Sequence, residues 1–185
     1  MPEEGVPQGS VLSVTLFSVA INNILEAVTP PVKCSLFVDD LAIYCTSYDA
    51  KSACQYLQRS INKITKWADE NGFKFSFSKT VAVRFSRSKR MEEIPTITLK
   101  GVILPYEKEV KFLGMILDNK LTWASHIGNL KNKVRESLNI LKVVSNFSWG
   151  ADKKSLLRLY DSLCRSKLTA LVNFTPLHVK QVYMK

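Results

Sequence analysis

The sequence predicts an α+β fold, in which an antiparallel sheet with helices on one face is followed by a small helical unit. Three observations favour this class. Short β-branched and apolar runs recur in the first two thirds of the 185 residues, two long segments there have helical periodicity, and the pattern beyond Asp118 is helical. We therefore divide the chain near Asn119, into residues 1–119, a helical unit at 120–174 and a tail at 175–185 that we expect to be loosely ordered.

The first elements are a helix and a hairpin. Apolar residues recur every fourth position between Gln8 and Val28, and Pro30-Pro31 follows, so we expect a helix that ends before the two prolines. The runs Val32–Val38 and Leu41–Thr46 are rich in apolar and β-branched residues, and the acidic pair between them suits a turn. The sequence thus predicts a hairpin with two carboxylates, Asp39 and Asp40, at its tip.

The next elements are a long helix and several short strands. Asp49 is a suitable N-cap for a helix that continues to Asn71-Gly72, with a clean apolar stripe at Ala53, Leu57, Ile61, Ile64 and Ala68. We expect this helix to lie across the sheet. The strand candidates are Val81–Phe85, Thr96–Leu99 and Val110–Leu117.

The last third of the chain is helical and basic. One helix is indicated by apolar residues from Ile127 to Leu141, and a second by Leu156 to Leu168 with Asp152 as its cap. Residues 120–185 contain 12 Lys and Arg against 3 Asp and Glu, and most of the net charge of +10 therefore lies here. Such a segment favours a polyanion as partner, although a basic face that serves only solubility remains an alternative.

Several classes of protein are disfavoured. The four cysteines show no C-x-x-C pairing and no nearby histidine at ligand spacing, which argues against a zinc site or a disulfide framework. The sequence has no signal-peptide pattern and no apolar run of the roughly 18 residues that a membrane span needs. We expect an intracellular protein without a membrane partner.

The adjacent carboxylates of Asp39 and Asp40 suggest a specific chemistry. Neighbouring carboxylates repel each other unless a cation shares the site, and oxygen ligands suit magnesium or manganese. Such sites carry out phosphoryl or nucleotidyl transfer. Taken alone, however, an Asp-Asp turn is more commonly a solvated loop.

Four blocks in order along the chain resemble a known family. They are GVPQGSVLSVTLFSVAIN (5–22), LFVDD (36–40), NGFKFSFSKT (71–80) and KFLGMILDNKLTW (111–123). Together they resemble the reverse transcriptase of a jockey-like non-LTR retrotransposon. The resemblance implies an incomplete polymerase palm followed by a basic thumb. It also implies an RNA-directed DNA polymerase that uses magnesium or manganese, an RNA template, a DNA primer and deoxynucleoside triphosphates, and that acts in the nucleus on chromosomal DNA.

The resemblance also implies roles for individual residues. Asp39 and Asp40 match the catalytic, metal-binding carboxylates, and Val38 stands where relatives have a small alanine near the primer end. Lys79 matches a catalytic lysine near the triphosphate, although a plain surface lysine is an equal alternative. A first group matches the loop that contacts the template and the nucleotide, namely Gln8, Gly9 and Ser10. A second group matches the primer grip, namely Phe112, Leu113 and Gly114.

Three points of the resemblance remain open. Phe112 and Leu113 also suit a plain core, and His126 of the thumb motif L-T-W-x-x-H-I suits packing or capping better than chemistry. The family's third carboxylate belongs to a strand that precedes the first block, and this sequence does not include it. We therefore expect weakened metal binding and turnover, with a catalytically inactive nucleic-acid-binding remnant as the alternative function. We also expect self-association through an exposed sheet edge.

Overall fold

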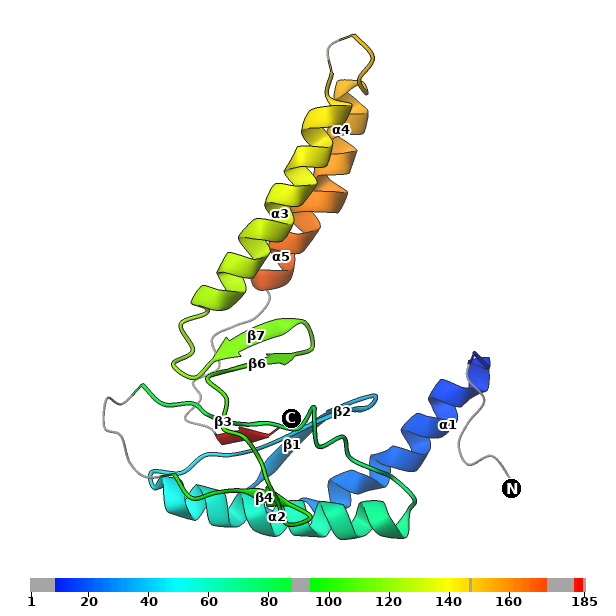
Figure 1. The fold of residues 1–185 in the computed structure, drawn as a ribbon. Coiled ribbons are helices and arrows are strands. Elements are labelled where there is room, and N and C mark those ends of the chain that lie inside the picture. The colour runs from blue at the N-terminus through cyan, green and yellow to red at the C-terminus, as the bar shows by residue number, and fades with distance from the viewer. Residues whose placement is uncertain (1–8, 88–93, 147, 173–181, 185) are drawn as a thin grey trace. The chain divides into compact units, whose positions relative to one another are not determined.

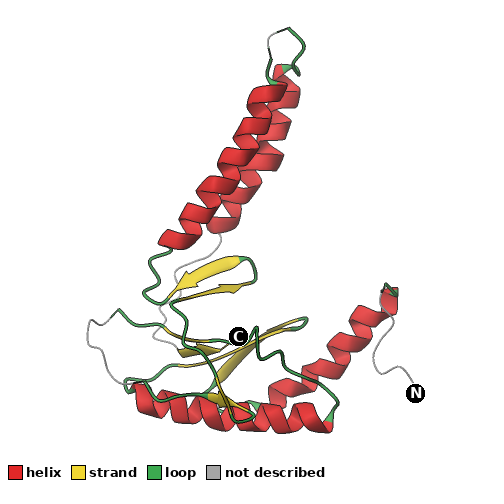
Figure 2. Cartoon of the chain, in the orientation of Figure 1, coloured by secondary structure: helices red, strands yellow, loops and turns green. Residues whose placement is uncertain are grey.

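The computed structural model describes residues 9–87, 94–146, 148–172 and 182–184, and confirms the predicted α+β class (Figures 1 and 2). The chain divides into two compact units. The first comprises residues 1–114, 119–121 and 179–185, and the second comprises residues 115–118 and 122–178. Within the described ranges, no helix combines the length and the apolarity needed to span a membrane.

The first unit begins with helix α1, Val11–Asn22, which tightens into the 3-10 turn η1, Asn23–Ala27. Ser10 has extended backbone angles immediately before α1, which marks the start of the helix. The 3-10 turn is a common way to end a helix, and it completes the predicted helical segment before Pro30-Pro31. Much of the apolar surface of α1 is exposed, and Val11 is 91% accessible.

The main sheet has four strands in the order β1-β2-β8-β3. Its members are β1 (Lys33–Phe37), β2 (Asp40–Cys45), β3 (Ala82–Arg84) and β8 (Val182–Met184). The predicted hairpin is confirmed as the antiparallel pair β1–β2. We expected a loosely ordered tail at 175–185, and for Val182–Met184 this is wrong, because β8 pairs with both β2 and β3. The rest of that tail lies outside the described residues.

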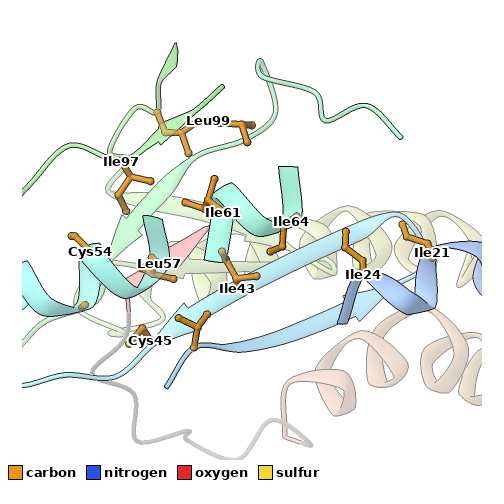
Figure 3. Packing of buried hydrophobic residues seen from close by; sticks show 13 residues of the cluster. Ile21, Ile24, Ile43, Cys45, Cys54, Leu57, Ile61, Ile64, Ile97 and Leu99 are labelled. Carbon is orange, nitrogen blue, oxygen red and sulfur yellow. The ribbon is translucent and has the colours of Figure 1, made fainter. Parts of the chain in front are cut away.

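Helix α2, Ala50–Glu70, covers the main sheet. As predicted, Asp49 caps it: the carboxylate accepts hydrogen bonds from the backbone N–H groups of Lys51 at 3.2 Å and Ser52 at 2.9 Å. These bonds satisfy two of the donors that every helix start leaves unpaired. The apolar stripe of α2 packs on β2 and η1 to form the core shown in Figure 3, whose fully buried members include Ile24, Ile43, Leu57, Ile61 and Ile64.

The remaining strands are short and form two-stranded sheets, β4 with β5 and β6 with β7. Their bounds are Thr98–Leu99, Val102–Ile103, Glu109–Phe112 and Met115–Asp118. The single strand predicted at Val110–Leu117 is wrong: a turn at Leu113-Gly114 splits it, and both turn residues have positive φ angles of 46° and 83°. A continuous apolar run concealed this turn, since leucine is rarely found at positive φ.

The second unit is a pair of packed helical segments. Helix α3, Ala124–Val144, lies beside α4 (Lys153–Tyr160), the π-helical turn η2 (Asp161–Arg165) and α5 (Ser166–Val172), as Figure 2 shows. The predicted cap Asp152 accepts a 2.7 Å hydrogen bond from the N–H of Ser155. The two segments are linked by the ammonium of Lys167, which donates to the hydroxyl of the buried Ser137 at 2.6 Å.

Asp118, at the end of β7, organises the start of α3. One carboxylate oxygen accepts hydrogen bonds from the N–H and the hydroxyl of Thr122, each at 3.0 Å, and the other accepts from the N–H of Trp123 at 2.8 Å. Burial of Asp118 opposes its ionisation, but these hydrogen bonds outweigh burial and hold the pKa of the carboxyl below its usual value.

We predict that Asp118→Ala lowers the free energy of unfolding at pH 7 by about 1–3 kcal/mol, because the partly buried N–H groups of Thr122 and Trp123 lose a charged acceptor. A lowered folded-state pKa contributes stability above the unfolded pKa of about 3.9, and that contribution is lost as the pH falls through the folded value. The difference between wild type and variant should therefore shrink below about pH 4. Urea unfolding followed by circular dichroism at pH 7 and pH 3 measures the free energies of unfolding of wild type and variant. A difference between them that is independent of pH would contradict the prediction.

Candidate active site at the acidic turn

The acidic pair lies at the connection of β1 to β2. Phe37 pairs with Asp40 across the hairpin, so the turn consists of only Val38 and Asp39. Asp40 is thus the first residue of β2, and Asp39 projects from the turn itself. Val38 has a φ angle of 54°, a left-handed conformation that is strained for a β-branched residue. Strained backbone of this kind concentrates at functional sites.

Both carboxylates line a pocket of about 270 Å³ within the first unit. Helix α2 and the loop that follows it also line this pocket, and the loop contributes Lys74 and Lys79. The remaining lining residues are Leu41, Ile61, Ile64, Phe75, Ser76, Thr80 and Leu99. The structure therefore brings together three residues that the sequence had singled out separately, Asp39, Asp40 and Lys79.

A tight turn positions Lys79. The carbonyl of Ser76 accepts three hydrogen bonds, from the N–H of Lys79 at 3.2 Å, the N–H of Thr80 at 3.1 Å and the hydroxyl of Thr80 at 2.8 Å. Thr80 is buried and leads into β3, which fixes the end of the loop against the sheet. Lys79 itself is exposed.

Two acidic and two basic side chains line this pocket, together with apolar ones. The carboxylate oxygens are hard ligands that fit magnesium or manganese, and the ammonium groups of Lys74 and Lys79 fit phosphate oxygens. Within the described parts of the chain, no cluster of three or more His, Cys, Asp or Glu side chains is placed to hold a metal ion. The described residues thus place two carboxylates, those of Asp39 and Asp40, at this pocket.

A comparison with known families identifies the family of the chain. Residues 1–117 match the model of the family described as reverse transcriptase (RNA-dependent DNA polymerase).

The chain belongs to the reverse transcriptase family.

Several relatives of this reverse transcriptase chain come from insect mobile elements. It is 30% identical over 151 residues to the RNA-directed DNA polymerase from mobile element jockey of Drosophila melanogaster, and 32% identical over 142 residues to that of Drosophila funebris. It is also 26% identical over 161 residues to the retrovirus-related Pol polyprotein from type-1 retrotransposable element R1 of Bradysia coprophila. These alignments confirm the predicted resemblance to jockey-like retrotransposons.

The alignments differ in how much of each protein they cover. They include 78%, 72% and 86% of this chain, but only 16%, 15% and 16% of the jockey, D. funebris and R1 proteins, respectively. The chain therefore spans about one sixth of the length of these relatives. No solved structure matches it.

The predicted template and nucleotide loop lies at the start of α1. Gly9 has a φ angle of 88°, which requires glycine, and both Gly9 and Ser10 are exposed. Neither is among the residues that line the pocket of the acidic turn. Gln8 lies outside the described residues. The role of this loop in the reverse transcriptase chain stays a prediction.

The predicted primer grip forms the turn between β6 and β7. Phe112 is only 5% accessible and belongs to the buried part of the first unit, whereas Leu113 is 43% accessible. Leu113 and Gly114 make the turn itself. Phe112 therefore has a packing role, and Leu113 and Gly114 are the members of this group that are placed to touch a ligand.

His126 in the thumb motif has a structural role, as the sequence indicated. Its Nδ1 atom accepts a 3.3 Å hydrogen bond from the N–H of Ile116, and its ring packs edge-on against Trp123 with centroids 6.4 Å apart. Both partners belong to the second unit. The histidine thereby ties β7 to the start of α3.

Lys74 is the pocket residue that sequence reasoning missed. It belongs to the same block, NGFKFSFSKT, as Lys79, and it lines the pocket together with Phe75 and Ser76. A signal was present, because the block places two lysines in one loop. Only the folded loop shows that both lysines line the same pocket as the acidic turn.

Proposed function

We propose that this chain carries part of the catalytic centre of an RNA-directed DNA polymerase, which adds deoxynucleotides to the 3′-OH of a DNA primer with RNA as template. The observation that carries the proposal is the meeting of Asp39, Asp40 and Lys79 in one pocket. Membership of the reverse transcriptase family and the names of the jockey relatives support it. We further propose that the reaction takes place in the nucleus, where chromosomal DNA supplies the primer.

In this proposal the acidic turn is the metal-binding element. Asp39 and Asp40 are the ligands for magnesium or manganese. The chemistry that these ions supply in a two-metal centre is a lowered pKa of the attacking hydroxyl and a neutralised charge on the leaving pyrophosphate. The short turn and its strained Val38 hold the two carboxylates in place, so that little reorganisation is needed during the reaction.

Lys79 binds the triphosphate in this proposal. Its ammonium lies in the same pocket as the acids, donates to phosphate oxygens and offsets their charge. Lys74, on the same loop, adds a second positive charge. The buried Thr80 and the carbonyl of Ser76 keep the loop, and hence Lys79, in position.

We predict that Lys79→Met lowers kcat/KM for the deoxynucleotide about 10- to 100-fold, the loss expected from one hydrogen bond to a charged group. The assay is primer extension by the purified chain on primed RNA with manganese. Lys66→Met is the matched control, since Lys66 lies on the exposed face of α2, where its pair with Glu70 at 3.8 Å contributes little. Equal losses in both variants would contradict the role of Lys79.

A second candidate function is nucleic-acid binding without chemistry. The charge of the second unit favours it: the exposed basic residues there are Lys131, Lys133, Arg135, Lys142, Lys153, Lys154, Arg158 and Arg165. Contacts of such residues with phosphates release counterions, so binding should weaken steeply with salt. If the purified chain binds primed template in this salt-sensitive way but never extends the primer, this second function replaces the first.

A further inference from the structure

The loop between α3 and α4 presents a tryptophan to solvent. Trp149 in this loop is 65% accessible. The other two tryptophans of the chain pack on neighbouring rings. Trp67 stacks on Phe73 with ring centroids 5.3 Å apart, and Trp123 lies edge-on against His126. An exposed indole offers a partner a large, rigid surface at little cost in conformational entropy, so Trp149 is a candidate contact residue.

The loop that carries Trp149 is held by its own hydrogen bonds (top of Figure 1). The side-chain oxygen of Asn146 accepts hydrogen bonds from the N–H of Ser148 at 3.0 Å and from its hydroxyl at 2.9 Å. The backbone carbonyl of Asn146 accepts a further one from the N–H of Gly150 at 2.8 Å. A side chain at position 150 would clash with the backbone of Asn146, so the loop requires glycine there. Trp149 is therefore carried by a closely packed turn.

The two helix ends that meet at this loop are basic. The N–H of Ala151 donates to the carbonyl of Val144 at 2.9 Å, which joins the end of α3 to the start of α4. Lys142 lies in the last turn of α3, and Lys153 and Lys154 are the first residues of α4. All three lysines are exposed. Positive charge thus flanks Trp149 on both sides of the loop.

This charge is not balanced within the same stretch of sequence. Residues 142–158 contain a single acidic residue, Asp152, whose carboxylate accepts from the N–H of Ser155 at 2.7 Å and from its hydroxyl at 3.2 Å. Arg158 in α4 adds a further exposed positive charge. A surface of this kind attracts phosphate groups.

From this arrangement we propose that Trp149 binds unpaired RNA by stacking on one of its bases, while the lysines around it bind the adjacent phosphates. Proteins commonly bind single-stranded nucleic acid with an aromatic ring on a positively charged surface. A duplex offers the same phosphates but keeps the faces of its bases stacked inside, so Trp149 should contribute to the binding of single-stranded RNA only.

The choice of RNA as the ligand rests on the proposed function. A tryptophan among cations also suits an acidic protein surface, but membership of the reverse transcriptase family favours nucleic acid. In the proposed reaction the primer is paired with the template, and the single-stranded nucleic acid is the part of the RNA template that has not yet been copied.

The test measures binding of the full chain to a short single-stranded RNA and to the blunt RNA–DNA duplex of the same sequence, without metal or deoxynucleotides. Trp149→Leu keeps an apolar side chain but removes the ring, and it should weaken binding of the single-stranded RNA about 5- to 100-fold, the loss expected from one stacked base. Trp149→Phe keeps an aromatic ring and should retain most of the affinity. Neither variant should change the affinity for the duplex by more than about twofold.

Fluorescence gives a second measurement that does not depend on the leucine variant. Single-stranded RNA should quench the tryptophan emission of the wild type, because a base stacks on the exposed indole. This quenching should be lost in Trp149→Phe, in which only Trp67 and Trp123 emit.

The matched control is Tyr48→Ala, which removes a fully exposed aromatic residue from the first unit, next to the acidic Asp49. It should bind both nucleic acids as the wild type does. The proposal is overturned if Trp149→Leu binds the single-stranded RNA as tightly as this control, if it loses affinity for single-stranded RNA and duplex equally, or if Trp149→Phe is as weak as Trp149→Leu. Equal quenching in the wild type and Trp149→Phe overturns it too. A chain that shows the expected binding but extends no primer would contradict the proposed polymerase function and not this inference.

Discussion

Asp39→Asn is expected to lower nucleotide incorporation by about a hundredfold to a thousandfold, the effect of removing one preorganised electrostatic group from a catalytic centre. Asparagine keeps the size of the side chain but removes the charge that holds a divalent cation. The fold should not change, because Asp39 is an exposed turn residue at the tip of the hairpin. Primer extension with manganese measures the loss, and circular dichroism checks the fold.

The matched control for this substitution is Asp161→Asn. It also removes one negative charge, but from the exposed surface of the second unit, where Asp161 pairs with Arg165 at 3.4 Å. Such a pair contributes little to stability, so the control should keep wild-type activity. If the Asp39→Asn variant is as active as the control, the acidic turn has no role in the reaction.

The second large effect concerns the core beneath the pocket. Leu57→Ala should lower the free energy of unfolding by about 2–5 kcal/mol, because Leu57 is fully buried between α2 and the sheet and its truncation leaves a cavity. In a unit of this size, the melting temperature should fall by about 10 °C or more. Thermal unfolding followed by circular dichroism measures the change.

Leu12→Ala serves as the control for the core. The same side chain is removed from α1 of the same unit, but Leu12 is 67% accessible, so the expected change is within about 0.5 kcal/mol. Similar losses at Leu57 and Leu12 would mean that α1 is as well packed as α2, contrary to the burial described above.

The parts of the fold that the sequence predicted are those with local signals. The hairpin and the caps Asp49 and Asp152 are specified by residues within a few positions of each other. The same holds for the apolar stripe of α2. The family resemblance then indicated which acidic residues and which lysine belong to one site.

The features that were missed depend on contacts between distant segments. Strand β8 has three residues and no period of its own, and its partners β2 and β3 lie far earlier in the sequence. Likewise, no sequence pattern distinguishes Lys74 from a surface lysine, and only the folded loop after α2 brings it to the same pocket as the acidic turn. The turn at Leu113-Gly114 was hidden by the apolar run around it.

The central claim is that the turn of Asp39 and Asp40 binds divalent cations. Titration of the isotope-labelled chain with manganese, followed by paramagnetic broadening of its backbone amide NMR signals, tests it directly without an activity assay. The account predicts broadening centred on residues 38–41 and on the loop around Lys79, and its loss in the double variant Asp39→Asn/Asp40→Asn. Broadening that is centred elsewhere, or that persists in the double variant, would contradict the account.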